Sequence, residues 1–285
     1  MSNVLKKVPQ FEPYVGLDEY ESIKSCFDIN WITEGPKSKE FVEKLCKKIG
    51  VEYGVLAPNG TLALYMGLKA MGIGVGDEVI VPNFTFIASA NAIEMVGATP
   101  VFVDVNVEDC QISVEDCERV ITPKTKAIMP IQLYGMSSNM TEVMGFANKH
   151  NIKVIEDSAQ GLGIKWKGKG CGSFGDVGCF SFFADKTLTT GEGGLVCTND
   201  KDIYEQLLYI RNQGRINRGS FVHPEIGYNF RMTDIQSAIG LTQLGKFDEI
   251  AGKKNVIHKV YTDLLKDVTE IKIIQPRDEV TSYIP

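Results

Sequence analysis

Short apolar runs and longer amphipathic segments alternate along most of the chain. Phe41, Leu45 and Ile49 recur at a spacing of four, which is typical of one face of a helix and predicts a helix over 37–48. Further helices are expected at 17–28, 62–71, 86–96 and 139–149, and short buried strands at 78–81, 101–103, 127–131, 153–155, 177–183 and 194–197. Strands that alternate with helices in this way predict an α/β fold, whose mostly parallel sheet is covered by helices on both faces.

The pattern changes near residue 232, after which we expect a long helix that continues to about residue 264. Residues 271–274 and the last five residues then look like strands. We therefore expect a large α/β domain over residues 1–245, which includes an N-terminal helical segment. Residues 246–285 are expected to form a bridging helix and the start of a small C-terminal domain.

The composition narrows the class of protein. The 285 residues are 44% hydrophobic and 23% charged, as in ordinary globular proteins, and the net charge of −6 argues against a nucleic-acid or membrane-surface partner. The seven cysteines include no CxxC pair and the three histidines are far apart, so we expect no metal site. The N-terminus has no apolar stretch typical of a signal peptide, which favours a cytoplasmic location.

One candidate site residue ends a predicted strand, and a pair of candidates opens a predicted helix. Gly60 and Thr61 offer N–H groups and a hydroxyl at a helix N-terminus, a favourable place for a phosphate, although a simple helix cap is the commoner explanation of such residues. Asp157 ends the strand KVIED, so its carboxylate could accept a proton from a buried cation such as a pyridinium nitrogen, or it could cap the next helix.

The segment CFSFFADKTLTTGEGG is the most informative stretch of the chain. Lys186 stands just past an apolar strand and before hydroxyls and glycines, so its amine can be partly desolvated. Desolvation favours the neutral amine, which is the nucleophile that a Schiff base requires, although most lysines are solvated surface residues. Ser181 lies five residues earlier, where its hydroxyl could contact the anion bound by Gly60 and Thr61.

Two other positions leave their roles open. Phe86 follows a strand end and is either part of the core or a ring that stacks on a planar ligand. Asn229, in GYNFRM, is otherwise an ordinary loop amide. The glycines at 72, 74 and 76 have the density of a dinucleotide-binding loop, but they precede a strand and are better explained as a helix terminator.

Seven ordered motifs resemble those of the DegT/DnrJ/EryC1/StrS family of pyridoxal-phosphate-dependent nucleotide-sugar aminotransferases. They are NGTLAL, GDEVIVPNFTFIASANAI, GATPVFVDV, LYG, VIEDSAQGLG, GSFGDVGCFSFFADKTLTTGEGG and GYNFRMTDIQSAIGLTQL, and the resemblance runs from about residue 10 to residue 265. FSFFADK and TTGEGG are most similar to the perosamine-synthase branch, which also has phenylalanine at the position of Phe183, where many members have histidine. The resemblance implies the type I fold of pyridoxal-phosphate enzymes, with a small C-terminal domain that is largely missing here.

The resemblance also implies a role for each candidate residue. Lys186 matches the lysine that is joined to the cofactor and moves protons, and Asp157 matches the carboxylate that keeps the pyridine nitrogen protonated. Gln160 matches a contact near the 3-hydroxyl of the ring. Phe86 matches the aromatic residue that stacks on the ring. Gly60, Thr61 and Ser181 match the residues that bind the phosphate. Asn229 matches a residue that reaches the phosphate of the neighbouring subunit's cofactor. A homodimer with shared active sites is therefore expected.

The implied reaction is transfer of an amino group from L-glutamate to a 4-keto-6-deoxyhexose nucleotide. Amination at C3 of the sugar is an alternative. A sugar dehydratase on the same fold is a second alternative, but in such enzymes histidine replaces the lysine at the position of Lys186. A non-catalytic relative is a third, because the chain ends at Pro285, just as the family's small domain would begin. We expect the loops 31–35 and 215–223 to bind the sugar.

Overall fold

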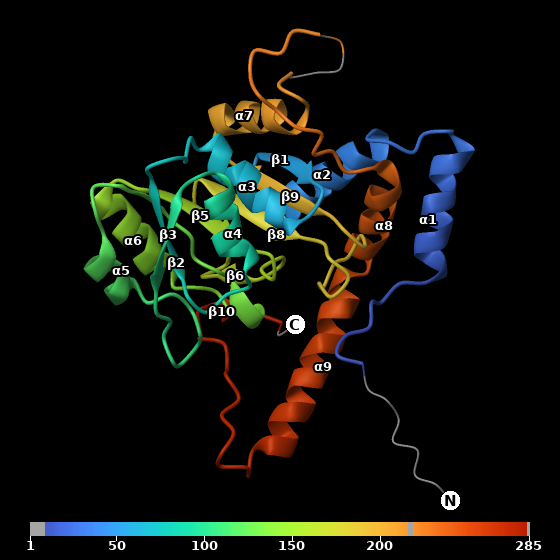
Figure 1. The fold of residues 1–285 in the computed structure, drawn as a ribbon. Helices are drawn as coiled ribbons and strands as arrows, with labels where there is room; N and C mark the ends of the chain where they lie inside the picture. Colours follow the sequence, from blue (N-terminus) through green and yellow to red (C-terminus); the bar gives the residue numbers. More distant parts are fainter. Residues whose placement is uncertain (1–8, 216–218, 220, 284–285) are drawn as a thin grey trace, which may run out of the picture.

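The computed structural model describes residues 9–215, 219 and 221–283, and a seven-stranded mixed sheet forms its centre (Figure 1). The strands are β1 (Tyr53–Ala57), β2 (Glu78–Pro82), β3 (Thr99–Val103), β4 (Thr125–Ile128), β5 (Lys153–Asp157), β8 (Val177–Ser181) and β9 (Gly194–Thr198). Their spatial order is β1-β9-β8-β5-β4-β2-β3. The strands from β3 to β8 in this order are parallel, whereas β9 is antiparallel to both of its neighbours. The prediction of a mixed, mostly parallel sheet is confirmed.

Helices cover both faces of this sheet (Figure 1). They are α1 (Leu17–Asp28), α2 (Pro36–Ile49), α3 (Gly60–Ala70), α4 (Ala88–Met95), α5 (Val114–Val120), α6 (Met140–His150), α7 (Lys201–Arg211), α8 (Asp234–Gly245) and α9 (Phe247–Leu265). One face packs against α3, α4 and α7, and the other against α2, α5 and α6, with α8 on α2 and α1 outside α8. Within β2, Val79 and Val81 join the first core and Ile80 joins the opposite one, as the two-residue period of a strand requires.

Helix α3 lies unusually close to the sheet, which matters because its first turn borders the candidate site. A Cβ atom at Gly67 would lie 2.9 Å from Cγ1 of Val177 on β8, so only glycine allows this approach. The N-terminus of α3 is fixed by Asn59, whose side chain accepts a hydrogen bond of 2.9 Å from the N–H of Leu62. Together these contacts fix where the helix begins relative to the sheet edge.

Several elements differ from the sequence-based expectation. The long helix expected over 232–264 is two helices, α8 and α9, which are separated at Lys246. The expectation of a strand at 271–274 is wrong, because this segment has no regular secondary structure. The pattern did not predict β1, α5 or α7, and the first of these forms the edge of the sheet next to β9.

The end of the described chain returns to the large α/β unit. Strand β10 (Val280–Thr281) pairs with β6 (Lys165–Trp166), which in turn pairs with β7 (Lys169–Gly170). Tyr283 is buried against Phe247 at the start of α9, with ring centroids 5.5 Å apart. Figure 1 shows α9 extending away from the sheet before the chain turns back. The division into two domains at residue 245 stays a prediction.

Asp234 joins two helices that lie far apart in the sequence. It is completely buried at the start of α8, and its carboxylate accepts hydrogen bonds from the N–H groups of Gly35, Lys37 and Ser38 at 2.8–3.1 Å. The hydroxyl of Ser38 donates a further bond of 2.6 Å. A buried carboxylate therefore caps the N-terminus of α2, where the helix dipole favours negative charge.

We expect Asp234→Ala to lower the free energy of unfolding by about 2–3 kcal/mol, because buried N–H groups lose a charged acceptor. Urea denaturation followed by circular dichroism measures this loss. The control is Asp248→Ala, since the side chain of Asp248 is 98% exposed and its surface pair with Lys48 contributes about 0–1 kcal/mol. A loss no larger than that of the control would contradict the capping role.

Candidate active site

The predicted site residues gather where parallel strands end. β5 ends at Asp157 and β8 ends at Ser181, and the two strands run in register with Asp157 opposite Cys179. The first residue of α3, Gly60, lies beside Ser181. Ligands of α/β sheets bind at this carboxyl edge, because the loops that follow the strands converge there.

Asp157 is held rigidly in a dry environment. It is 5% exposed, and its carboxylate accepts hydrogen bonds from the hydroxyl of Ser89 at 2.7 Å and the N–H of Ala159 at 3.1 Å. Thr85 in turn lies 2.9 Å from the Ser89 hydroxyl. Burial raises the pKa of Asp157 above its ordinary value, while these two hydrogen bonds and the charge of Lys186 act in the opposite direction. A cation placed against this carboxylate would therefore be bound strongly.

Lys186 lies on the loop after β8 and is within electrostatic reach of Asp157. Its N–H donates to the carbonyl of Phe183 at 3.0 Å, which forms a tight turn. Its amine pairs with the carboxylate of Asp185 at 3.0 Å, and the side chain of Lys186 is only 20% exposed. The structure thus supports the partly desolvated lysine and not the alternative of a fully solvated surface residue.

Gly60 and Ser181 are in direct contact. A Cβ atom at position 60 would lie 2.8 Å from Cβ of Ser181 and 3.1 Å from its hydroxyl oxygen, so a larger residue could not occupy this position without a shift. The first-turn N–H groups of α3, which include those of Gly60 and Thr61, have no carbonyl partner within the helix. They lie next to the Ser181 hydroxyl, and this combination is suited to a phosphate.

Gln160 fixes a strained residue at the edge of the site. Tyr134 has a φ of +54°, which non-glycine residues rarely adopt, and its N–H donates to the Gln160 side-chain oxygen at 2.7 Å. The Tyr134 ring lies 6.2 Å from the ring of Phe84. Sequence reasoning noted the motif LYG but did not assign Tyr134 to the site, because its backbone conformation has no sequence pattern.

The structure settles the position of two further candidates. Phe86 is 73% exposed beyond the end of β2, so it is not a core residue. Asn229 is exposed, and its backbone forms an isolated antiparallel bridge with Asn212, the residue that follows α7. Within the described part of the chain, no recorded contact joins Asn229 to Lys186, Asp157 or Ser181.

A second buried carboxylate, that of Glu156, stabilises the same edge of the sheet. Glu156 is completely buried, and burial raises its pKa, although the N–H groups of Gly175, Gly172 and Phe174 and the side chain of Gln132 all donate to it at 2.7–3.1 Å and oppose that rise. The backbone N–H of Gln132 also donates to the carbonyl of Asp157 at 2.9 Å. Through Gln132, Glu156 therefore fixes the segment after β4, which is hydrogen-bonded to the end of β5.

A cavity of about 750 Å³ opens beside Lys186. Its walls are the loop residues 184–187, Tyr134, Gln160, the N-terminal residues 10–14 and one face of α9. From α9 it receives Lys254 and His258, which sequence reasoning missed. Their spacing of four within the predicted helix could have shown that they share a face, but not that this face meets the site.

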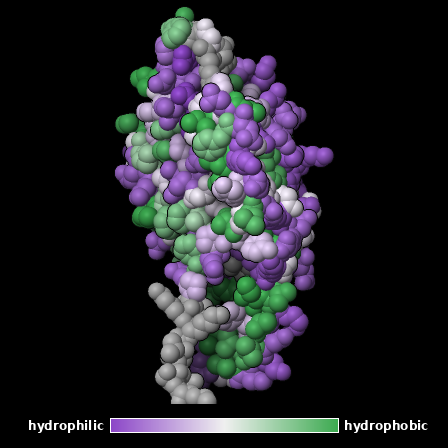
Figure 2. Space-filling model, turned by 90° about the vertical axis from the view of Figure 1, so that its right-hand side faces the viewer, coloured by the Kyte–Doolittle hydropathy of each residue, from purple (hydrophilic) through white to green (hydrophobic). Residues whose placement is uncertain are grey.

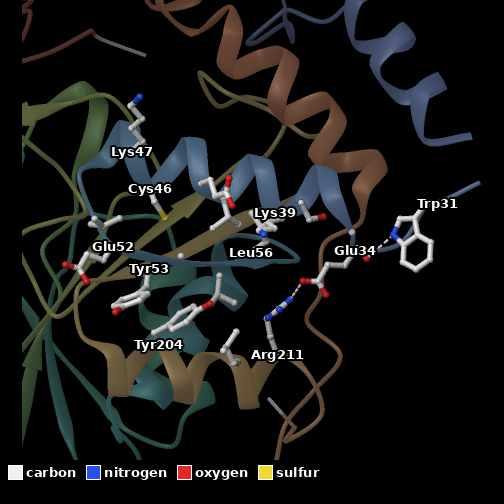
Figure 3. Close-up of a pocket in the computed structure, with 18 residues that line it drawn as sticks. Trp31, Glu34, Lys39, Cys46, Lys47, Glu52, Tyr53, Leu56, Tyr204 and Arg211 are labelled. Carbon is white, nitrogen blue, oxygen red and sulfur yellow. Dashed lines mark hydrogen bonds and ion pairs between the residues drawn. The ribbon is translucent and has the colours of Figure 1, made fainter. Parts of the chain in front are cut away.

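A second cavity of the same volume lies between α2, β1 and α7 (Figure 3). The guanidinium of Arg211 pairs with Glu34, and the Trp31 ring N–H donates to the Glu34 carbonyl at 3.1 Å. Figure 3 shows Glu34 and Arg211 pointing toward one another and Tyr53 close to Tyr204, whose rings stack at 4.7 Å. Of the expected sugar-binding loops, 31–35 contributes to this cavity and not to the one beside Lys186. Residues 216–218 and 220 of the loop 215–223 lie outside the described residues.

The described residues do not support a metal site, a membrane-spanning helix or a nucleophilic role for Cys179 or Cys197. In residues 9–215, 219 and 221–283, no group of three or more His, Cys, Asp or Glu side chains could hold a metal ion. Among the helices of these same residues, none combines the length and apolar character needed to cross a bilayer. Burial raises the pKa of the Cys179 and Cys197 thiols far above the ordinary value, so neither is a nucleophile at neutral pH.

Comparison with known proteins identifies the class. The chain matches the model of the DegT/DnrJ/EryC1/StrS aminotransferase family over residues 13–284, and it belongs to that family of enzymes. It is 44% identical to GDP-perosamine synthase of Escherichia coli O157:H7 over 268 residues, which cover 94% of this chain and 74% of that protein.

Two further relatives bear on the substrate and the cofactor. A UDP-N-acetyl-3-dehydro-alpha-D-glucosamine 3-aminotransferase of Acidithiobacillus ferrooxidans is 48% identical over 67% of this chain and 51% of its own length. The solved structure of a sugar aminotransferase from Streptococcus pneumoniae in its PMP form superposes with a TM-score of 0.92 at 28% identity, covering 97% of this chain and 75% of that one. The expected type I fold is confirmed.

The buried carboxylate should make stability depend on pH. Because the folded-state pKa of Asp157 is raised, the folded chain loses stability as the pH rises through that pKa. Asp157→Asn removes the ionisation and leaves Ser89 and Ala159 with partners. In protein without added ligands, we expect the variant to be more stable than the parent at pH 7 by about 0.5–2 kcal/mol. The difference in stability should disappear below about pH 4, where Asp157 of the parent is protonated and therefore as neutral as the asparagine that replaces it in the variant.

Urea denaturation of both proteins at pH 7 and at pH 4 measures the difference. Glu156 is present in both, so its own titration cancels. A variant less stable than the parent at pH 7, or a difference that does not change with pH, would show that burial of the charge at position 157 carries no cost.

Proposed function

We propose that this chain is a pyridoxal-phosphate-dependent aminotransferase that moves an amino group from L-glutamate to a GDP-linked 4-keto-6-deoxyhexose. The product would be a 4-amino-4,6-dideoxyhexose nucleotide for polysaccharide synthesis. The observation that carries the proposal is the buried carboxylate of Asp157 within electrostatic reach of the half-buried amine of Lys186. The similarity to GDP-perosamine synthase supports the choice of nucleotide and of sugar carbon.

The residues at the sheet edge fit the cofactor. Gly60 lies against the Ser181 hydroxyl at the start of α3, which suits the phosphate, and Thr61 adds a hydroxyl on the same turn. Phe86 presents an exposed ring that can stack on the pyridine. Pyridoxal phosphate, when bound, supplies an aldehyde for covalent attachment and a ring that withdraws electrons from the reacting carbon.

Each protein group then has a defined task. Asp157 holds the proton on the pyridine nitrogen, because an ionised carboxylate in a dry site is most stable beside a cation. Lys186 would hold the cofactor covalently until the amino group of glutamate displaces it. The freed Lys186 amine would then remove the proton from the α-carbon of glutamate and return a proton on the cofactor side. The side-chain oxygen of Gln160 accepts from Tyr134, so its amide N–H groups remain for the 3-hydroxyl of the ring.

Amination at C3 is the second candidate, because the Acidithiobacillus relative is named for that position. The dehydratase alternative requires histidine in place of Lys186 and is therefore less well supported. Transamination in two half-reactions predicts ping-pong kinetics for either sugar position.

We also propose a homodimer with shared active sites, in the cytoplasm. Large apolar side chains are exposed on α1 and the turn after it, at Leu17, Tyr20, Phe27, Ile29 and Ile32. Figure 2 shows scattered apolar side chains between polar ones on the upper part of this face, and a larger apolar area below, where α9 exposes Val256, Ile257, Val260, Tyr261 and Leu264. Exposed patches of this kind are typical of interfaces. The proposal requires a solution mass of two chains by light scattering, and it assigns Asn229 to the partner's phosphate.

Borohydride reduction in the presence of pyridoxal phosphate should attach the cofactor to Lys186, which peptide mapping identifies. Lys186→Ala should lose the visible absorption band of the bound cofactor and at least about 100-fold in kcat, since general acid–base catalysis contributes factors of this size. Lys153→Ala, a lysine on the surface at the start of β5, is the control and should keep both. Labelling of a different lysine would refute the assignment.

The sugar position can be decided with wild-type enzyme. With L-glutamate as donor, we expect the highest kcat/KM for a GDP-linked 4-keto-6-deoxyhexose, measured by release of 2-oxoglutarate. A 3-keto-sugar nucleotide should be at least 10-fold poorer, because a displaced carbonyl cannot lie next to the same amine. Preference for the 3-keto substrate would replace the first candidate with the second.

A further inference from the structure

We infer that Lys254 and His258 of α9 bind a carboxylate of the amino donor in the cavity that also contains Lys186. This inference rests on the proposed function and adds the residues that would select the donor. The two side chains are one helical turn apart on the same face of α9, and both line the cavity that contains Lys186 and Gln160.

Neither side chain has an anionic partner among the described residues. Lys254 is half-buried, and none of the salt bridges of these residues involves its amine. The neighbouring Lys253, in contrast, is exposed and pairs with Glu249 at 2.8 Å. Nε2 of His258 is buried and has no hydrogen-bond partner among the described residues. Buried polar atoms are nearly always satisfied in native proteins, so a ligand is expected to complete the His258 ring, with the Lys254 amine one helical turn away.

The charges around the cavity favour an anion at this place. Burial lowers the pKa of Lys254, and the positive charge of Lys186 acts in the same direction. The carboxylate of Asp185 opposes this effect, but it is already paired with Lys186. Glu12 is the other acid on the cavity wall. An incoming carboxylate would therefore relieve the repulsion between two lysines that face one cavity.

The reaction indicates which anion this is. The α-carbon of glutamate must lie next to the Lys186 amine, and its two carboxylates are then only a few bonds from that amine. In a 4-keto-sugar nucleotide, the reacting carbon and the diphosphate lie on opposite sides of the sugar ring. A cation on the wall of the same cavity as Lys186 is therefore better placed for the donor than for the diphosphate.

Lys254→Gln tests the inference on the holoenzyme. Loss of one charge-assisted hydrogen bond should raise KM for L-glutamate by about 10- to 100-fold and leave KM for the sugar nucleotide within about 2-fold. Lys254→Arg should restore most of the affinity for glutamate. His258→Ala should raise the same KM to a smaller extent, because one ring N–H supplies a single donor, whereas the ammonium group of Lys254 supplies three. Lys253→Gln is the matched control and should behave as the wild type.

Direct binding separates the donor from the diphosphate. In calorimetry, Lys254→Gln should bind glutarate, a dicarboxylate without an amino group, at least 10-fold more weakly than the wild type does, and should bind GDP equally well. Weaker GDP binding with unchanged glutarate binding would overturn the inference. So would unchanged binding of both ligands by a variant whose urea midpoint equals that of the wild type. Failure of borohydride to label Lys186 in the wild type would instead refute the proposed function.

Discussion

The parallel register of β5 with its neighbours is the constraint on which the site depends. It brings Asp157 to the carboxyl edge of the sheet, where Ser89 and the backbone of residue 159 fix its carboxylate. Burial there makes the charged form costly, and the hydrogen bonds from Ser89 and Ala159 and a nearby cation offset that cost. The same edge receives Ser181 from β8 and the first turn of α3, so the proposed phosphate site and the buried acid share one rigid support.

A second layer of buried hydrogen bonds keeps this edge in place. Glu156, one residue before Asp157, is bound by three backbone N–H groups and by Gln132. Gln132 also accepts from the N–H of Ser138, so the segment between β4 and α6 is tied to β5 on both sides of Tyr134. This arrangement explains how a residue with φ of +54° is tolerated beside the cavity, since the surrounding bonds over-determine its position.

The sequence predicted much of the fold, and it pointed to the residues of the site one by one. The period of apolar positions gave α1 with its observed bounds and placed the main strands within a few residues, because local geometry produces that period. It missed β1, an edge strand without a long apolar run, and it joined α8 and α9 because the break at Lys246 changes no periodicity. Phe86 is exposed as a stacking ring would require, while among the described residues Asn229 has no hydrogen bond to Lys186, Asp157 or Ser181.

Residue type and periodicity by themselves determined most of the strands and helices, and the positions where chemistry-bearing side chains follow strands. Tertiary structure alone decided which of these side chains meet. Asp234 caps a helix that begins about two hundred residues earlier in the chain, and α9 brings Lys254 and His258 to the cavity wall. Neither relation has a local pattern, because each depends on how separate elements pack and on which polar groups are left without water.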